Sequence, residues 1–297
     1  MPLQSCTLRA IARSLARLGL CCLVPSVALA ALPPPQTWMQ RSLGNGHGLA
    51  VFDHATGKFA DWWVRPYRAY APGQATHDVL FDAYFGLQVS GQGGKWATSL
   101  PLVFADGKPW KAALGADDSV FGYVGPAGVV HERRQWSGSA PLQLQTFAFA
   151  PQTCGDRCLA LVAKVDNSGD APVVVTVVLL PNLHLGNGAP QPGSDSEALS
   201  ATAAGLLETG PAGQVVAVPM TGATAKACTN NPYSELTSGS LTCSTLALAP
   251  GQDRAGSLQW QLTVPAKGSA VAGAVLGYAE KGSALPALAD WLAQRTA

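Results

Sequence analysis

The density of short β-type segments is the feature that most constrains how this chain folds. Runs rich in Val, Leu, Thr and aromatic residues recur along the chain, and Gly, Pro, Asn and Asp separate them. Helical periodicity is nearly absent until the last residues. This pattern is typical of a β-sandwich or a barrel. The predicted strands cover residues 49–53, 83–89, 120–124, 129–135, 142–149, 159–166, 173–180, 205–208, 215–218, 244–248, 257–264 and 270–278.

Three segments indicate how these strands are arranged. The run "VVVTVVLL", residues 173–180, is apolar on both alternating faces, which predicts a strand covered on each side inside a thick, multi-sheet body. The run "LQWQLTV", residues 258–264, alternates apolar and polar residues and should be half exposed. Turn residues in "VDNSGDAP", residues 165–172, predict a hairpin that makes its two flanking strands antiparallel neighbours. We therefore expect an all-β fold.

The first thirty residues have the pattern of a secretory signal peptide. Arg9, Arg13 and Arg17 precede a short apolar run that closes with Ala28 and Ala30. The run is too short to span a bilayer as a helix. We expect cleavage near Ala30 and a periplasmic or extracellular protein without a membrane span.

The remaining chain divides into three parts. Residues 31–41 form a Pro-rich segment, and residues 42–282 carry the β pattern as one sandwich domain. Residues 283–297 form the predicted C-terminal amphipathic helix. Its cap is Ser283, and its apolar face contains Leu285, Leu288 and Leu292.

The cysteines indicate disulfides. Without the signal peptide the chain keeps Cys154, Cys158, Cys228 and Cys243. An even number of cysteines in an oxidising compartment indicates two bridges, for which three pairings exist. We favour the local pairs Cys154–Cys158 and Cys228–Cys243. A zinc site is disfavoured because CxxC-like spacings are absent.

The charge balance restricts the class of partner. The signal peptide contains three Arg and no acidic residue, so 16 of the 19 Lys and Arg residues remain against 18 Asp and Glu. A nucleic-acid-binding protein would normally show a basic face. Nucleic acid and anionic membranes are therefore poor partners, and a neutral poly- or oligosaccharide suits the composition better.

Catalytic motifs are absent from the sequence. It contains no GxSxG, HExxH, Walker-type or GxGxxG motif after a strand. His131 and Glu132 could supply an acid and a base, but adjacent residues on a strand point to opposite faces and cannot cooperate there. We predict no catalytic residue, no bound metal and no cofactor for this chain alone.

Residues 43–70 resemble the start of the N-terminal β-sandwich of bacterial glucoamylase-type enzymes, the family-15 glycoside hydrolases. Related sandwiches occur in maltose and cellobiose phosphorylases. Residues 158–186 and 248–293 are similar to later strands of the same domain, so the resemblance spans residues 42–293. The matching residues at the start are Asn45, Gly46, Val51, Asp53 and Gly57, followed by the aromatic-Pro element Trp62, Trp63, Arg65, Pro66 and Tyr67.

The resemblance implies a fold and a location of catalysis in a separate domain. The fold would be a large antiparallel super-β-sandwich of the galactose-mutarotase-like kind. In that family, catalysis belongs to a separate (α/α)6 barrel that carries two carboxylates as acid and base. No position here corresponds to the barrel, so no catalytic residue can be transferred. The resemblance thus implies a non-catalytic, carbohydrate-associated domain, accessory to or split from such a catalytic barrel.

The aromatic segment supplies the candidate sugar contacts, because flat rings stack on the apolar faces of pyranoses and arginine donates hydrogen bonds as a fork. The alternative is that alternate members of "WWVRPY" are buried as an anchor between a strand and a loop. The candidates are Trp62, Trp63, Arg65, Tyr67 and Tyr70.

Two other function classes stay open. The first is a sugar-active enzyme of the mutarotase or lyase kind, which would use the concave face of the sandwich with His131, Glu132 or His184. A histidine and a carboxylate within hydrogen-bond reach in a concave pocket would support it. The second is a structural envelope protein without any binding site.

Overall fold

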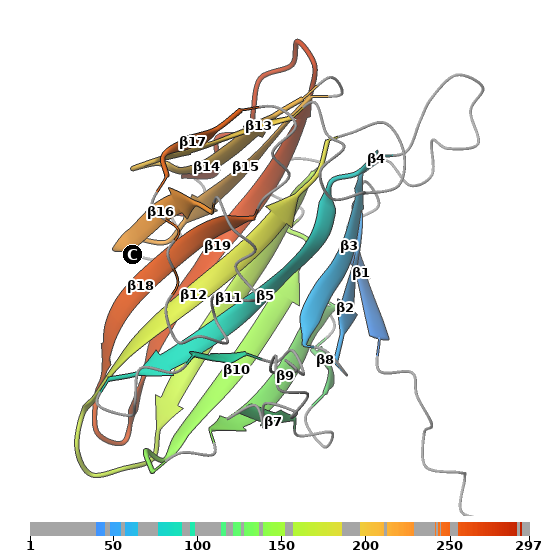
Figure 1. Ribbon diagram of the computed structural model, residues 1–297. Coiled ribbons are helices and arrows are strands. Elements are labelled where there is room, and N and C mark those ends of the chain that lie inside the picture. The colour runs from blue at the N-terminus through green and yellow to red at the C-terminus, as the bar shows by residue number, and fades with distance from the viewer. Residues whose placement is uncertain are drawn as a thin grey trace, which may run out of the picture. The chain divides into compact units, whose positions relative to one another are not determined.

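The computed structural model confirms an all-β fold built from two large antiparallel sheets (Figure 1). It describes residues 40–44, 48–54, 57–64, 77–90, 96–98, 114–116, 121–125, 128–136, 139–151, 157–185, 197–210, 213–228, 241, 243, 245–249, 255–289 and 292. The predicted signal peptide and the segment up to residue 39 lie outside these ranges, so both stay predictions.

The first sheet is nine-stranded, with the order β1-β2-β3-β5-β12-β18-β16; β4 pairs with β3, and β6 pairs with β5. Its strands come from both halves of the chain. They are β1 (Gln40–Gly44), β2 (Gly48–Asp53), β3 (Lys58–Val64), β4 (His77–Asp78), β5 (Leu80–Val89), β6 (Trp96–Thr98), β12 (Val173–Leu183), β16 (Ala223–Ala227) and β18 (Gly256–Val264).

The second sheet is ten-stranded, with the order β17-β13-β14-β15-β19-β11-β10-β9-β7, and β8 pairs with β9. Long strands with many ladder bonds form its centre. Its strands are β7 (Leu114–Ala116), β8 (Gly122–Val124), β9 (Val129–Trp136), β10 (Leu142–Phe149), β11 (Cys158–Asn167), β13 (Ala198–Thr202), β14 (Gly205–Thr209), β15 (Gly213–Pro219), β17 (Ala247–Leu248) and β19 (Gly268–Glu280).

The core lies between the sheets, because alternate residues of each strand point inward. In β18, Trp260 and Val264 are buried while Gln261 and Thr263 are exposed, which confirms the predicted alternation. In β12, every residue from 177 to 183 is buried, as the doubly apolar pattern predicts, but Val174 near its start is exposed. One hydrophobic cluster joins residues of both sheets.

The predicted hairpin between β11 and β12 is wrong. Strand β11 pairs with β10 and β19, whereas β12 pairs with β5 and β18 in the other sheet. The turn residues predicted a chain reversal correctly, but composition does not tell whether the chain stays in one sheet. The connection from β18 to β19 also crosses between the sheets, and both corners lie at the same end (Figure 1).

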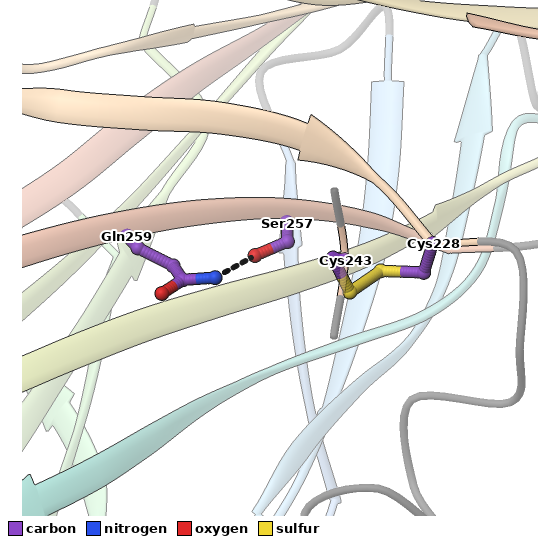
Figure 2. The surroundings of a disulfide bond; sticks show 4 residues. All are labelled: Cys228, Cys243, Ser257 and Gln259. Atoms are coloured by element: carbon purple, nitrogen blue, oxygen red, sulfur yellow. Dashed lines mark hydrogen bonds between the residues drawn. A yellow bond between two sulfur atoms is a disulfide. The ribbon is translucent and has the colours of Figure 1, made fainter. Parts of the chain in front are cut away.

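The predicted disulfide between Cys228 and Cys243 is present (Figure 2). It joins the end of β16 to the segment before β17, where Ala227 and Thr245 also pair through their backbones. Cys158 is disulfide-bonded as well. Its expected partner, Cys154, lies outside the described residues, so that pairing stays a prediction.

Replacing Cys228 and Cys243 together by Ala should lower the free energy of unfolding by about 3 kcal/mol. The reason is that a cross-link over a sequence separation of 15 residues restricts the unfolded chain by that amount. Urea unfolding of the double variant measures the loss. Reductant is not a substitute, because it would also attack the bridge at Cys158. A midpoint equal to that of the parent chain would contradict the prediction.

The C-terminal segment packs on the ten-stranded sheet. Residues 288, 289 and 292 are helical, and Leu288 is buried against Cys158, Ala160 and Val275. Leu292 is partly buried at the same cluster. Residues 283–287 are not helical, so the predicted start of the helix at Ser283 is wrong, and Leu288 and Leu292 cover one part of the outer face of this sheet.

Candidate functional site

The two tryptophans of the aromatic segment lie on opposite faces of β3, because successive side chains of a strand alternate. Trp62 is 1% exposed and belongs to the core, so it offers no ring face to a sugar, and the stacking interpretation is corrected for this residue. Trp63 is 36% exposed on the outer face of the nine-stranded sheet. The alternative interpretation of a buried anchor therefore holds for Trp62.

The other candidates of that segment, Arg65, Tyr67 and Tyr70, lie outside the described residues. Their contact with a sugar stays a prediction. Within the described part of β3, Trp63 offers one exposed ring, which by itself is less than a stacking platform.

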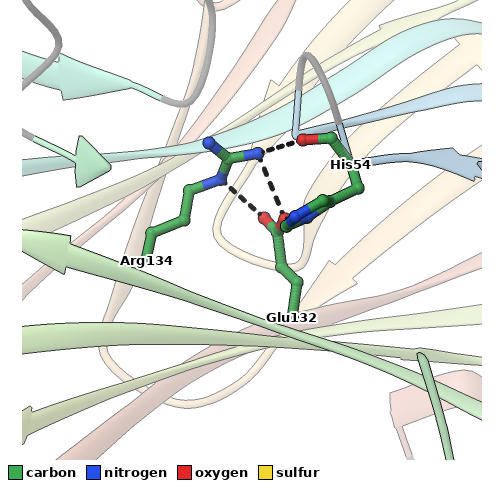
Figure 3. Close-up of polar contacts among 3 residues, drawn as sticks. All are labelled: His54, Glu132 and Arg134. Carbon is green, nitrogen blue, oxygen red and sulfur yellow. Dashed lines mark hydrogen bonds and ion pairs between the residues drawn. The ribbon is translucent and has the colours of Figure 1, made fainter. Parts of the chain in front are cut away.

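Glu132 belongs to a buried polar cluster with His54 and Arg134 (Figure 3). The Nδ1–H of His54 donates to Glu132 Oε2 at 2.7 Å. Arg134 donates to the same carboxylate through Nε at 2.9 Å and through Nη2 at 3.1 Å, and Nη2 also donates to the backbone carbonyl of His54. Such a forked, charge-assisted pairing is among the stronger hydrogen-bond arrangements in proteins.

Local structure explains how this cluster forms. His54 follows β2 in a turn where Gly57 adopts a left-handed φ of 65°, so the chain reverses with the imidazole directed inward. Glu132 and Arg134 occupy the inward-facing positions of β9. The imidazole also stacks on Phe121, with ring centroids 4.3 Å apart. The cluster thus links the nine-stranded sheet to the ten-stranded sheet.

The burial of this cluster argues against the role that the enzyme hypothesis gave to Glu132. His54 is 0% exposed and Glu132 is 2% exposed, so a substrate cannot reach either group in this conformation. The negative carboxylate is already neutralised by the guanidinium. We interpret the cluster as an internal tie between the sheets.

His184 also pairs with a carboxylate in the interior. Its Nδ1 lies 3.7 Å from Oε1 of Glu197, and the backbone N–H of Leu185 donates to the same oxygen at 2.6 Å. Both side chains are buried. The sequence-based hypothesis named His184 but missed Glu197, which lies at the other end of the connection between β12 and β13.

His131 faces outward from the ten-stranded sheet, opposite to Glu132, as the alternation predicts. Its Nε2 lies 2.8 Å from Oε1 of Gln145, and because an amide oxygen only accepts, Nε2 carries the hydrogen. The imidazole stacks on Phe147, with centroids 4.5 Å apart. The amide of Gln145 donates in turn to Asp166, and Lys164 lies 2.8 Å from Asp166.

We call His131, Gln145, Lys164 and Asp166 the polar row. It crosses strands β9, β10 and β11 on a face that solvent reaches. The row alternates donors and acceptors, and the Phe147 ring adds an apolar surface beside them. Gln145 lies between His131 and Asp166, so the histidine and the carboxylate are not in contact. The arrangement suits recognition of hydroxyl groups better than acid–base catalysis.

A sequence signal for the polar row exists. Polar residues occupy alternate positions in "LQLQ" and "AKVD", which are parts of β10 and β11, and every position of "HERRQ" in β9 is polar. The signal identifies exposed faces, but only the register of the strands shows that these side chains meet. Among the described residues, no group of three His, Cys, Asp or Glu side chains could hold a metal ion. In the same part of the chain, no helix is long and apolar enough to cross a membrane.

No protein-family model matches the sequence, and no curated protein sequence matches it either. The resemblance to the glucoamylase-type sandwich is therefore not confirmed by sequence comparison.

The structure is similar to solved structures of galactose mutarotase-like proteins. A galactose mutarotase related enzyme from Lactobacillus acidophilus aligns with 83% of this chain and 99% of its own, at 8% identity and a TM-score of 0.41. A galactose mutarotase-like protein from Lactobacillus casei ATCC 334 aligns with 81% of this chain and 100% of its own, at 9% identity and a TM-score of 0.42. The 4-alpha-glucanotransferase of Thermococcus litoralis aligns with 80% of this chain and 37% of its own, at 8% identity and a TM-score of 0.35. At such low identity the likeness concerns the fold, and it carries no argument about function.

Proposed function

We propose that this chain is an exported, non-catalytic carbohydrate-associated domain that binds a neutral polysaccharide on the outer face of its ten-stranded sheet. The observation that carries the proposal is the polar row beside Phe147. Sugar hydroxyls both donate and accept hydrogen bonds, and the row presents an imidazole, an amide, an ammonium and a carboxylate whose positions are fixed by one another. Phe147 offers the apolar contact that pyranose faces favour.

Two further observations support a neutral ligand and a non-catalytic role: the charge balance of the chain and the burial of its histidine–carboxylate pairs. After removal of the signal peptide the chain is nearly neutral, which fits a neutral ligand better than a polyanion. Within the described residues, the two close histidine–carboxylate pairs are buried, so neither supplies an accessible acid and base for hydrolysis.

Export and a catalytic partner belong to the same proposal. The basic and apolar pattern of residues 1–30 and the disulfide between Cys228 and Cys243 both suit an oxidising compartment. The resemblance to the glucoamylase-type sandwich suggests a separate (α/α)6 barrel as the catalytic partner. Co-purification of a glycoside hydrolase with the exported chain would support that part.

Retention on a polysaccharide tests the proposal directly. The mature chain, residues 31–297, should be retained on starch, dextran or β-glucan without releasing reducing sugar. Gln145→Ala and Phe147→Ala should each weaken retention by about tenfold, because each removes one contact worth about 1.4 kcal/mol. Affinity electrophoresis measures the retention, and thermal unfolding checks the fold. No retention on any polysaccharide would contradict the proposal and leave a structural role.

A sugar-active enzyme is the second candidate function. The observation that favours it is the pair His184–Glu197, a histidine and a carboxylate 3.7 Å apart. Because both side chains are buried, this function requires a change of conformation that exposes them. Polarimetry of a fresh α-pyranose solution, with and without the purified chain, tests it. Faster mutarotation that Glu197→Gln abolishes would support this candidate, and an unchanged rate would exclude mutarotation.

A further inference from the structure

Three turns meet at the end of the sandwich where the two corners cross between the sheets. They are the turn between β9 and β10 near residue 141, the corner between β11 and β12 at residues 168–172, and the corner between β18 and β19 at residues 265–267. Figure 1 shows both corners at the lower left of the view. The backbone N–H of Ser168 donates to the carbonyl of Pro141 at 3.0 Å, which joins the first turn to the second.

Asn167 fixes the two corners to each other. Its side-chain amide is buried and donates to the carbonyls of Ala171 at 2.8 Å and Pro265 at 3.1 Å, and its oxygen accepts from the N–H of Gly169 at 2.9 Å. These bonds use both ends of the amide. The base of this region is therefore rigid, as a preformed binding site requires.

An open pocket of about 480 Å³ lies over this base, a volume typical of small-molecule sites. Two residues of the polar row, Lys164 and Asp166, line it together with Gln143, Lys267 and Ser269. The pocket therefore continues the polar row to the end of the sheet. We call it the corner pocket.

Lys267, which lines the corner pocket, adopts an unfavourable backbone conformation. Its φ is 51°, and the other described residues in the left-handed region are glycines. Lysine is strained there, whereas Gly or Asn would fit more easily. Its ammonium donates to the carbonyl of Ser168 at 2.7 Å and pairs with Asp170 at 3.0 Å.

The local contacts of Lys267 do not explain why a lysine occupies this position. The Lys267 and Asp170 side chains are 63% and 93% exposed, and ion pairs in such positions stabilise little. Strain retained without a compensating gain in stability is a common sign of a functional residue. The two described contacts leave one of the three ammonium hydrogens for a ligand in the pocket.

We propose that the corner pocket is a saccharide-binding site and that Lys267 is one of its contact residues. This inference rests on the proposed function and locates one sugar unit of the bound chain. Lys267, Gln143 and Ser269 would donate to hydroxyls, while Asp166 would accept from them. Lys164 balances Asp166, and Asp170 balances Lys267, so the pocket suits a neutral, hydroxyl-rich ligand.

Lys267→Asn tests the site, because asparagine tolerates the left-handed conformation and removes only the long ammonium side chain. Affinity electrophoresis with the polysaccharide that the parent chain retains should show about tenfold weaker binding, as the loss of one charge-assisted hydrogen bond predicts. The melting temperature should equal or exceed that of the parent chain. Gln143→Ala, outside the strained turn, should also weaken binding.

The matched control is Lys281→Asn. Lys281 is an exposed lysine in the turn after β19, at the other end of that strand, and its loss should leave binding unchanged. If Lys267→Asn and Gln143→Ala bind as the parent does while Gln145→Ala binds weakly, the corner pocket is not a site although the proposed function stands. If the parent chain binds no polysaccharide, the proposed function is wrong, and the corner pocket is not a saccharide site either. Retention only of uronate polysaccharides, lost in salt, would overturn the neutral ligand class.

Discussion

Glu132→Ala is expected to lower the free energy of unfolding by about 3–5 kcal/mol, as is usual when one partner of a buried ion pair is removed. The change leaves the Arg134 guanidinium buried without its carboxylate, and the His54 imidazole loses its acceptor at 2.7 Å. The turn after β2 and strand β9 would lose the contact between His54 and Glu132 and keep the hydrogen bond from Arg134 to the backbone carbonyl of His54. Urea unfolding followed by tryptophan fluorescence measures the loss.

Gln135→Ala is the control for this prediction, because Gln135 is an exposed residue of the same strand. It should change stability by less than about 0.5 kcal/mol. Replacing Glu132 by Leu and Arg134 by Met together should cost less than Glu132→Ala alone, since no unpaired charge then remains. Stability of Glu132→Ala within about 1 kcal/mol of the parent would refute the view that this cluster ties the sheets together.

The alternation of apolar and polar residues in single strands was enough to predict the fold class. It located β18 and its exposed face correctly, because that pattern is local. It did not locate β3, which contains both Trp62 and Trp63. The sequence "KFADWWV" does not alternate regularly, and in the structure the register of β3 shifts where it pairs with β2. A bulge interrupts the simple alternation on which the prediction depends.

The sheet in which each strand lies could not be predicted. The residues between β11 and β12 are those of a hairpin turn, yet the chain passes from one sheet to the other there. Sheet membership depends on which distant strands pair, such as β11 with β19 and β12 with β5. One sequence contains no direct signal for such pairings. The corner pocket was missed for the same reason, since two corners form it together.

The candidate site shows the same limit at the level of side chains. The enzyme hypothesis named His131, Glu132 and His184, but the sequence did not identify the residues that they contact in the structure, Gln145, His54 and Glu197. The His54–Glu132 contact joins residues 78 positions apart. Residue type and spacing can show which face a side chain occupies, and the strand register decides what it meets.

Trp62→Ala is expected to lower the free energy of unfolding by about 3–5 kcal/mol, as for other buried tryptophans. Trp62 is 1% exposed and packs in the cluster shared by both sheets, so its removal leaves a cavity that the surrounding strands cannot close. Because Trp62 offers no ring to a ligand, those Trp62→Ala molecules that fold should retain polysaccharide as the parent does. Urea unfolding measures the loss of stability, and affinity electrophoresis below the melting temperature measures the retention.

Trp63→Ala is the matched control, because the same residue type is replaced one position along the same strand. Trp63 is 36% exposed, so its loss should cost less than about 1 kcal/mol. Its effect on retention decides the stacking prediction: weaker retention at unchanged stability would place a sugar on the outer face of the nine-stranded sheet as well. If the two variants lose the same stability, Trp62 and Trp63 contribute equally to the core, and their different exposure does not decide their roles.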